Sequence, residues 1–72
     1  MKMAYFINQT VMNEKGEYIP CIAKEGEKGY YKTDWAWGRD LDVAEQIADE
    51  KNEGMGLTKK EAMSIVLRSM RG

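Results

Sequence analysis

The sequence predicts an α+β fold: a three-stranded antiparallel β-meander followed by two α-helices packed on one face of the sheet. Three observations predict it. Residues 3–35 hold β-branched and aromatic segments separated by glycine-containing turns. Residues 41–53 and 58–70 repeat apolar side chains at helical spacing. The chain has 72 residues, so we expect a single domain over 1–72 with a thin hydrophobic core.

Turn signals divide the first half of the chain into three expected strands. Residues 3–12 are rich in β-branched and aromatic side chains, and their imperfect alternation leaves open which face is buried. Asn13 and a following glycine suit a type I turn that leads into a second strand, 17–24. Pro20 has no backbone N–H, which places this strand at an edge or its proline at a bulge. Another glycine-containing turn leads to a third strand, 29–35.

The first helix is expected over 41–53. Both Asp40 and Asp42 can cap it, and Asp42 is the better candidate because Glu45 follows three residues later, as in a capping box. The side chains at helical spacing that we expect to face the sheet are Leu41, Ala44, Ile47 and Ala48.

The second helix is expected over 58–70 and begins with a clear signal. Thr58 and Glu61 form a capping box, and Leu57 can pack onto Ala62 as a hydrophobic staple. The i, i+3, i+4, i+7 pattern predicts a buried stripe of Met63, Val66, Leu67 and Met70, with Ala62 and Ile65 beside it.

Composition excludes several classes of site. The chain has no histidine and one cysteine, Cys21, so it can form neither an internal disulfide nor a Cys/His zinc site, and histidine acid–base catalysis is excluded. Cys21 has apolar neighbours and is expected to be a buried small hydrophobe. We therefore expect no enzyme activity, no metal and no other cofactor. Without a long apolar run or a signal peptide, and with an unpaired cysteine, the expected location is the cytoplasm, with no membrane contact.

Charge is segregated along the chain. Residues 34–53 hold seven acidic and two basic side chains, whereas 57–72 hold four basic and one acidic. Acidic residues early in the first helix favour its dipole, and the opposed charges favour packing of the two helices. Alternatively, the acidic helix faces a basic partner, such as a nucleic-acid-binding protein whose DNA site it occupies, or it forms an oligomer contact.

Aromatic residues are concentrated in one short segment. Four of the seven aromatic side chains lie between residues 30 and 37. If the segment is extended, Tyr31, Trp35 and Trp37 share one face and Tyr30 has the other. We expect one subset to fill the gap between sheet and helix and the other to be an anchor at a protein interface. The candidate binding residues are Trp35, Trp37, Asp42, Glu45 and Asp49.

Two other functions stay open. The helix pair could belong to a DNA-binding regulator that uses Lys59, Lys60 and Arg68, although the long turn and the pI of about 5.4 argue against nucleic acid. A small core could also be completed by a second copy, which would make self-assembly the main role.

The segments DLDVAEQIADEKN and LTKKEAMSIVLRSM resemble small accessory proteins of phages and mobile elements of Gram-positive bacteria. The resemblance covers the C-terminal half and carries over no functional residue. It implies a protein that binds host or phage proteins rather than one that catalyses. The expected function is therefore a small non-catalytic protein-interaction module.

Overall fold

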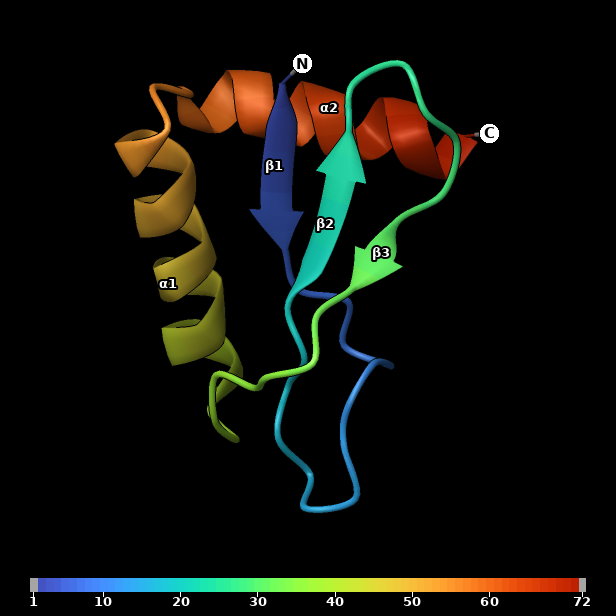
Figure 1. Ribbon diagram of the computed structural model, residues 1–72. Coiled ribbons are helices and arrows are strands. Elements are labelled where there is room, and N and C mark those ends of the chain that lie inside the picture. Colours follow the sequence, from blue (N-terminus) through green and yellow to red (C-terminus); the bar gives the residue numbers. More distant parts are fainter. Residues whose placement is uncertain (1, 72) are drawn as a thin grey trace.

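The computed structural model describes residues 2–71. Three strands precede two helices, and the strand order in the single sheet is β1-β2-β3 with both pairs antiparallel. The predicted α+β meander followed by helices is confirmed (Figure 1). The elements are β1 (Met3–Phe6), β2 (Cys21–Lys24), β3 (Tyr31–Lys32), α1 (Leu41–Gly54) and α2 (Lys59–Arg71).

The first strand is shorter than the expected range 3–12, because Asn8 turns the chain. The Asn8 side-chain oxygen accepts hydrogen bonds from the Thr10 backbone N–H at 3.0 Å and from the Thr10 hydroxyl at 2.7 Å. Such local bonds compete with a strand ladder. Pairing resumes only as an isolated bridge between Met12 and Tyr18.

The second and third strands are also shorter than the expected ranges 17–24 and 29–35. β2 begins directly after Pro20, which cannot donate to a ladder. The Pro20 carbonyl accepts a hydrogen bond from the Thr33 N–H at 3.0 Å, and from there the chain leaves the sheet. The predicted turn after Asn13 is confirmed, with Gly16 in the left-handed region at φ +77°.

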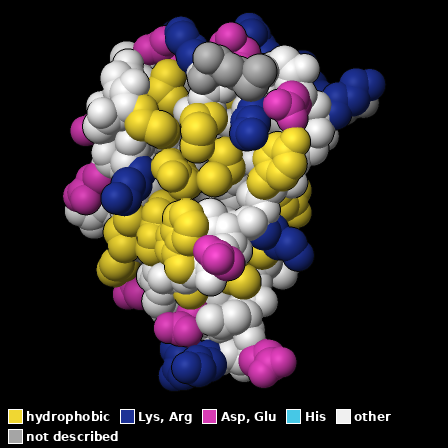
Figure 2. Space-filling model, in the orientation of Figure 1, with side chains coloured by type: hydrophobic (Ala, Val, Ile, Leu, Met, Phe, Trp, Pro, Cys, Tyr) yellow, Lys and Arg dark blue, Asp and Glu magenta, His cyan; other side chains and the backbone are white. Residues whose placement is uncertain are grey.

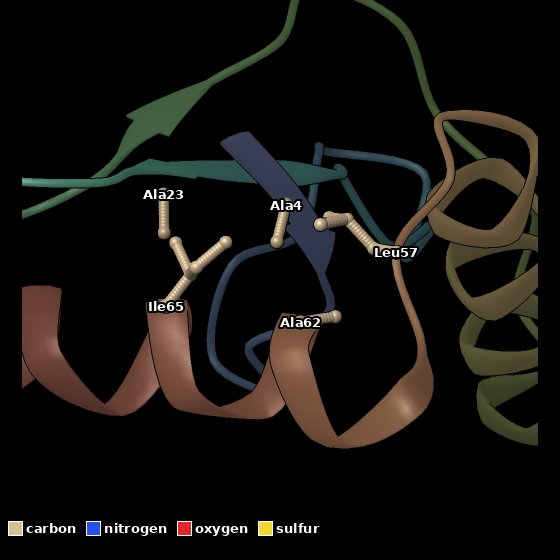
Figure 3. Packing of buried hydrophobic residues seen from close by; sticks show 5 residues of the cluster. All are labelled: Ala4, Ala23, Leu57, Ala62 and Ile65. Carbon is tan, nitrogen blue, oxygen red and sulfur yellow. The ribbon is translucent and has the colours of Figure 1, made fainter. Parts of the chain in front are cut away.

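α2 lies across one face of the sheet, behind β1 and β2 in the view of Figure 1. The contact is made by the small core that Figure 3 shows, in which α2 side chains meet the inward side chains of the two strands. The predicted capping box is confirmed: the Glu61 N–H donates to Thr58 Oγ1 at 3.1 Å, and the Thr58 N–H donates to Glu61 Oε1 at 3.2 Å. The core cluster consists of Ala4, Ala23, Leu57, Ala62 and Ile65.

The stripe that α2 buries differs from the expected one. Ala62, Ile65 and Ser69 are buried against the sheet. Met63 and Met70, which were expected inside, are exposed. The strands present Ala4, Cys21 and Ala23 toward α2, so the helix can come close to the sheet, and Ile65 is the large apolar side chain of α2 that is buried there.

α1 runs alongside β1 (Figure 1) and contacts β1 and α2. Its buried residues are Ala44, Ala48 and Asn52. The expected cap, Asp42, is wrong: Asp40 is the N-cap, and its carboxylate accepts the Val43 N–H at 3.2 Å. Asp42 lies within the first turn, where its charge favours the helix dipole.

A tight C-terminal turn joins the two helices. The Leu57 N–H donates to the Asn52 carbonyl at 3.0 Å, and the Gly56 N–H donates to the Glu53 carbonyl at 2.9 Å. This bond pattern is a Schellman motif, and Gly56 supplies the left-handed residue that it needs at φ +85°. The turn thereby places Leu57 in the core.

Candidate binding surfaces

The two tryptophans of the predicted site have different environments. Trp37 is half-buried and stacks on Tyr5, with ring centroids 5.7 Å apart. Trp35 is 48% exposed. The segment after Thr33 is not extended, because the Thr33 hydroxyl donates back to the Trp35 carbonyl at 3.0 Å. The expected common face of the two indoles therefore does not form.

Trp37 belongs to an uncovered face of the sheet. Side chains alternate along a strand, so the residues between the inward Ala4, Cys21 and Ala23 face away from α2. Figure 2 shows hydrophobic side chains gathered across this side of the molecule. We call it the open sheet face, and define it by Met3, Tyr5, Ile22, Tyr31 and Trp37.

The exposed edge of the open sheet face is partly polar. The Tyr31 ring lies under the Lys24 ammonium, with Nζ 4.8 Å from the ring centroid. The Tyr31 hydroxyl donates to Glu27 Oε1 at 2.6 Å, and this bond raises the pKa of Tyr31. These two contacts hold the Tyr31 ring in place.

The acidic residues of the predicted site lie elsewhere, on α1. Glu45 and Asp49 line a hollow between α1, α2 and the end of β1, and neither tryptophan lines it. Asp42 is exposed one turn earlier on the same helix. The structure thus separates the predicted site residues into an aromatic group and an acidic group.

The hollow is a groove of about 620 Å³. One wall is α1, the other is α2, and the floor includes Phe6 and Ile7. Lys59 and Asp49 join the two walls through an ion pair of 3.6 Å. We call this hollow the helix groove; its apolar wall on α2 is Met63, Val66, Leu67 and Met70, and its wall on α1 is Glu45, Ala48, Asp49 and Asn52.

Of the two helices in residues 2–71, α2 carries the more exposed apolar side chains, and these form the α2 wall of the groove. Met63, Leu67 and Met70 are 57%, 54% and 53% exposed. Contiguous exposed apolar side chains in a small protein mark interaction sites. The sequence analysis assigned this stripe to the core. The signal that sequence reasoning missed is the small side chains of Ala4, Cys21 and Ala23, which face inward from the strands. Small side chains on a sheet allow a helix to pack close to it.

Asn52 was not predicted as an important residue. It is 3% exposed and pairs with the outer edge of β1. Its Oδ1 accepts the Tyr5 N–H at 2.7 Å, and its Nδ2 donates to the Tyr5 carbonyl at 3.0 Å. The side-chain amide therefore occupies the place of a neighbouring strand, and this edge is closed to strand addition at Tyr5.

The single cysteine, Cys21, is buried. Burial raises the pKa of Cys21, so its sulfur is a thiol at neutral pH rather than a nucleophilic thiolate. Within residues 2–71, no group of three His, Cys, Asp or Glu side chains is placed to hold a metal ion.

The three basic residues of the DNA-binding alternative do not all lie on one side of α2. Lys59 pairs with Asp49. Arg68 lies nine positions further along the chain, about 180° around the helix axis at roughly 100° per residue. Lys60 is exposed between them. Lys60 and Arg68 are about 80° apart by the same measure and share one exposed side of α2, whereas Lys59 lies opposite Arg68.

None of the helices in the described part of the chain has the length and apolar character needed to cross a membrane. Comparison of the chain with protein-family models, curated proteins and solved structures gives no match.

Proposed function

We propose that the protein is a small non-catalytic interaction module that binds another protein through the helix groove. One observation carries the proposal: α2 buries Ala62, Ile65 and Ser69 against the sheet. It leaves Met63, Leu67 and Met70 exposed along a concave surface. A covering partner would remove this apolar surface from water, which is favourable by about 25 cal/mol per Å² before the costs of association.

The proposal retains part of the predicted site and changes the rest. Glu45 and Asp49 remain contact residues, on the wall opposite the apolar stripe. Trp37 is assigned to the open sheet face, and Trp35 to a separate exposed position. We propose the cytoplasm as the location and a host or phage protein as the partner, in line with the resemblance to mobile-element accessory proteins.

A capture experiment with matched variants tests the proposal. The wild-type chain and a Met63→Ser, Leu67→Ser variant are immobilised and exposed to host lysate. Controls are Trp35→Ala and Val43→Ser, which remove exposed apolar side chains that do not line the groove. Circular dichroism verifies that each variant is folded.

We expect the groove variant alone to lose the captured protein. Loss with Trp35→Ala and retention with the groove variant would contradict the proposal and favour the aromatic segment. Salt-sensitive binding of duplex DNA, abolished by Lys60→Glu and Arg68→Glu, would instead favour the DNA-binding regulator.

A further inference from the structure

We infer that the partner element held in the helix groove is an amphipathic α-helix whose apolar stripe is flanked by lysine or arginine. This inference rests on the proposed function and specifies the chemistry of the ligand. Three features of the groove carry it: a closed strand edge, apolar side chains on one wall, and carboxylates on the other.

The closed strand edge excludes an added β-strand at this place. A bound extended segment needs partners for its backbone N–H and C=O groups. Tyr5 lines the groove on the edge of β1, and its N–H and C=O are both occupied by Asn52. The α2 wall offers only thioether and aliphatic side chains. A helix satisfies its backbone groups internally, so it can enter this groove without losing hydrogen bonds.

The apolar wall specifies one face of the incoming helix. Met63, Leu67 and Met70 are spaced one turn apart along α2, and Phe6 and Ile7 lie at the floor. Helix-in-groove recognition uses apolar anchors at i, i+3, i+4 and i+7 on the ligand. Methionine side chains adapt to irregular apolar surfaces, which suits a ligand with leucine-type anchors.

The acidic wall specifies the flank. Glu45 and Asp49 are one turn apart and both line the groove. The only cation in the groove lining is Lys59, which pairs with Asp49. Of the ion pairs formed among residues 2–71, none involves Glu45. The groove therefore carries excess negative charge on the α1 side, and a basic flank complements it.

Synthetic peptides provide the probe. The first is a 15-residue Leu/Lys peptide with leucine at i, i+3, i+4 and i+7 and lysine on the flanks. The second has glutamate in place of every lysine. The third is the lysine peptide with two central residues changed to proline, which prevents a helix. Each is titrated into the full chain at low salt.

Methionine methyl NMR locates the contact. We expect the lysine peptide to shift the methyl signals of Met63 and Met70, which line the groove, and to leave those of Met12 and Met55 unchanged, because they are exposed but do not line it. Attraction of a lysine flank and repulsion of a glutamate flank by the exposed Glu45 predict that the lysine peptide binds roughly fivefold more tightly than the glutamate peptide. Glu45→Gln should reduce this preference to about one, because the remaining charges of Asp49 and Lys59 cancel. Leu67→Ser should abolish binding, whereas Val43→Ser should retain it.

Several outcomes would overturn the inference. Equal binding of the proline peptide would exclude a helical ligand, and equal binding of the glutamate peptide would exclude a basic one. Sedimentation velocity of the chain alone tests for self-association. If the chain is a dimer and Leu67→Ser makes it a monomer, the groove binds a second copy rather than a partner helix. If no peptide binds but lysate capture still depends on Met63 and Leu67, the inference fails and the proposed function stands. If that capture is also independent of the two residues, both fail.

Discussion

The two helices reach the sheet in different ways. α1 docks at the edge of β1 through the buried side-chain amide of Asn52. α2 docks on the face of the sheet through Ala62 and Ile65, with no polar contact in the core cluster. The edge contact depends on two hydrogen bonds with fixed geometry. The face contact depends on the size of the side chains that lie between α2 and the sheet. Met63, Leu67 and Met70 are more than half exposed and line the groove between the two helices.

The largest expected effect comes from breaking the edge contact. Asn52→Ala leaves the Tyr5 N–H and C=O without partners, and each buried unsatisfied group costs about 1–3 kcal/mol. We expect the free energy of unfolding to fall by about 2–4 kcal/mol, measured by urea denaturation. The control on the same helix is Gln46→Ala, at an exposed position. Equal loss in the two variants would show that α1 does not depend on this amide.

The face contact is tested by placing leucine at two adjacent positions of α2. Ala62 is buried against the sheet, whereas Met63 points outward. Ala62→Leu should lower the free energy of unfolding by about 1–3 kcal/mol through overpacking. Met63→Leu should change it by no more than about 0.5 kcal/mol, as for other surface substitutions. Similar changes in the free energy of unfolding for the two variants would mean that side-chain size does not determine which face of α2 is buried.

This pair of residues also explains what the sequence could and could not predict. Capping signals at Thr58 and turn signals at Asn13 act over a few residues, so they predicted the element order and the start of α2. Apolar periodicity predicted that α2 is amphipathic, but it does not distinguish Ala62 from Met63. That choice depends on how closely the strands let the helix approach, which is a tertiary property.

The candidate site was predicted only in part, for the same kind of reason. Glu45 and Asp49 share one face of a helix, and local spacing is enough to place them together. Trp35 and Trp37 were paired on the assumption of an extended backbone, which the Thr33 hydrogen bond breaks. The role of Asn52 requires a partner 47 positions earlier in the chain, which no local pattern identifies.

A smaller effect on stability is expected at the start of α2, where the capping box contains the titratable carboxyl group of Glu61. Hydrogen bonds from the Thr58 backbone and side chain, and then Lys2, lower the pKa of Glu61 below its ordinary value of 4.5. A carboxyl whose pKa is lowered by folding stabilises the fold above the unfolded pKa and loses this contribution as the pH falls through the folded one. Glu61→Gln should thus be less stable than wild type at pH 7, and the gap should narrow as the pH falls below about 4.5 and close once it is below the lowered pKa of folded Glu61. A gap that persists in acid would assign the difference to packing rather than to charge.

The smallest effect on the free energy of unfolding is expected for the exposed apolar side chains of α2. Met63→Ser and Leu67→Ser remove side chains that are more than half exposed, so we expect each to change the free energy of unfolding by no more than about 0.5 kcal/mol. Urea denaturation measures this, and binding of a hydrophobic dye should decrease in the same variants. A loss of several kcal/mol would mean that the stripe contributes to the fold. Stability that is unchanged together with lost partner binding would mean that the chain keeps these side chains for recognition, because folding does not require them.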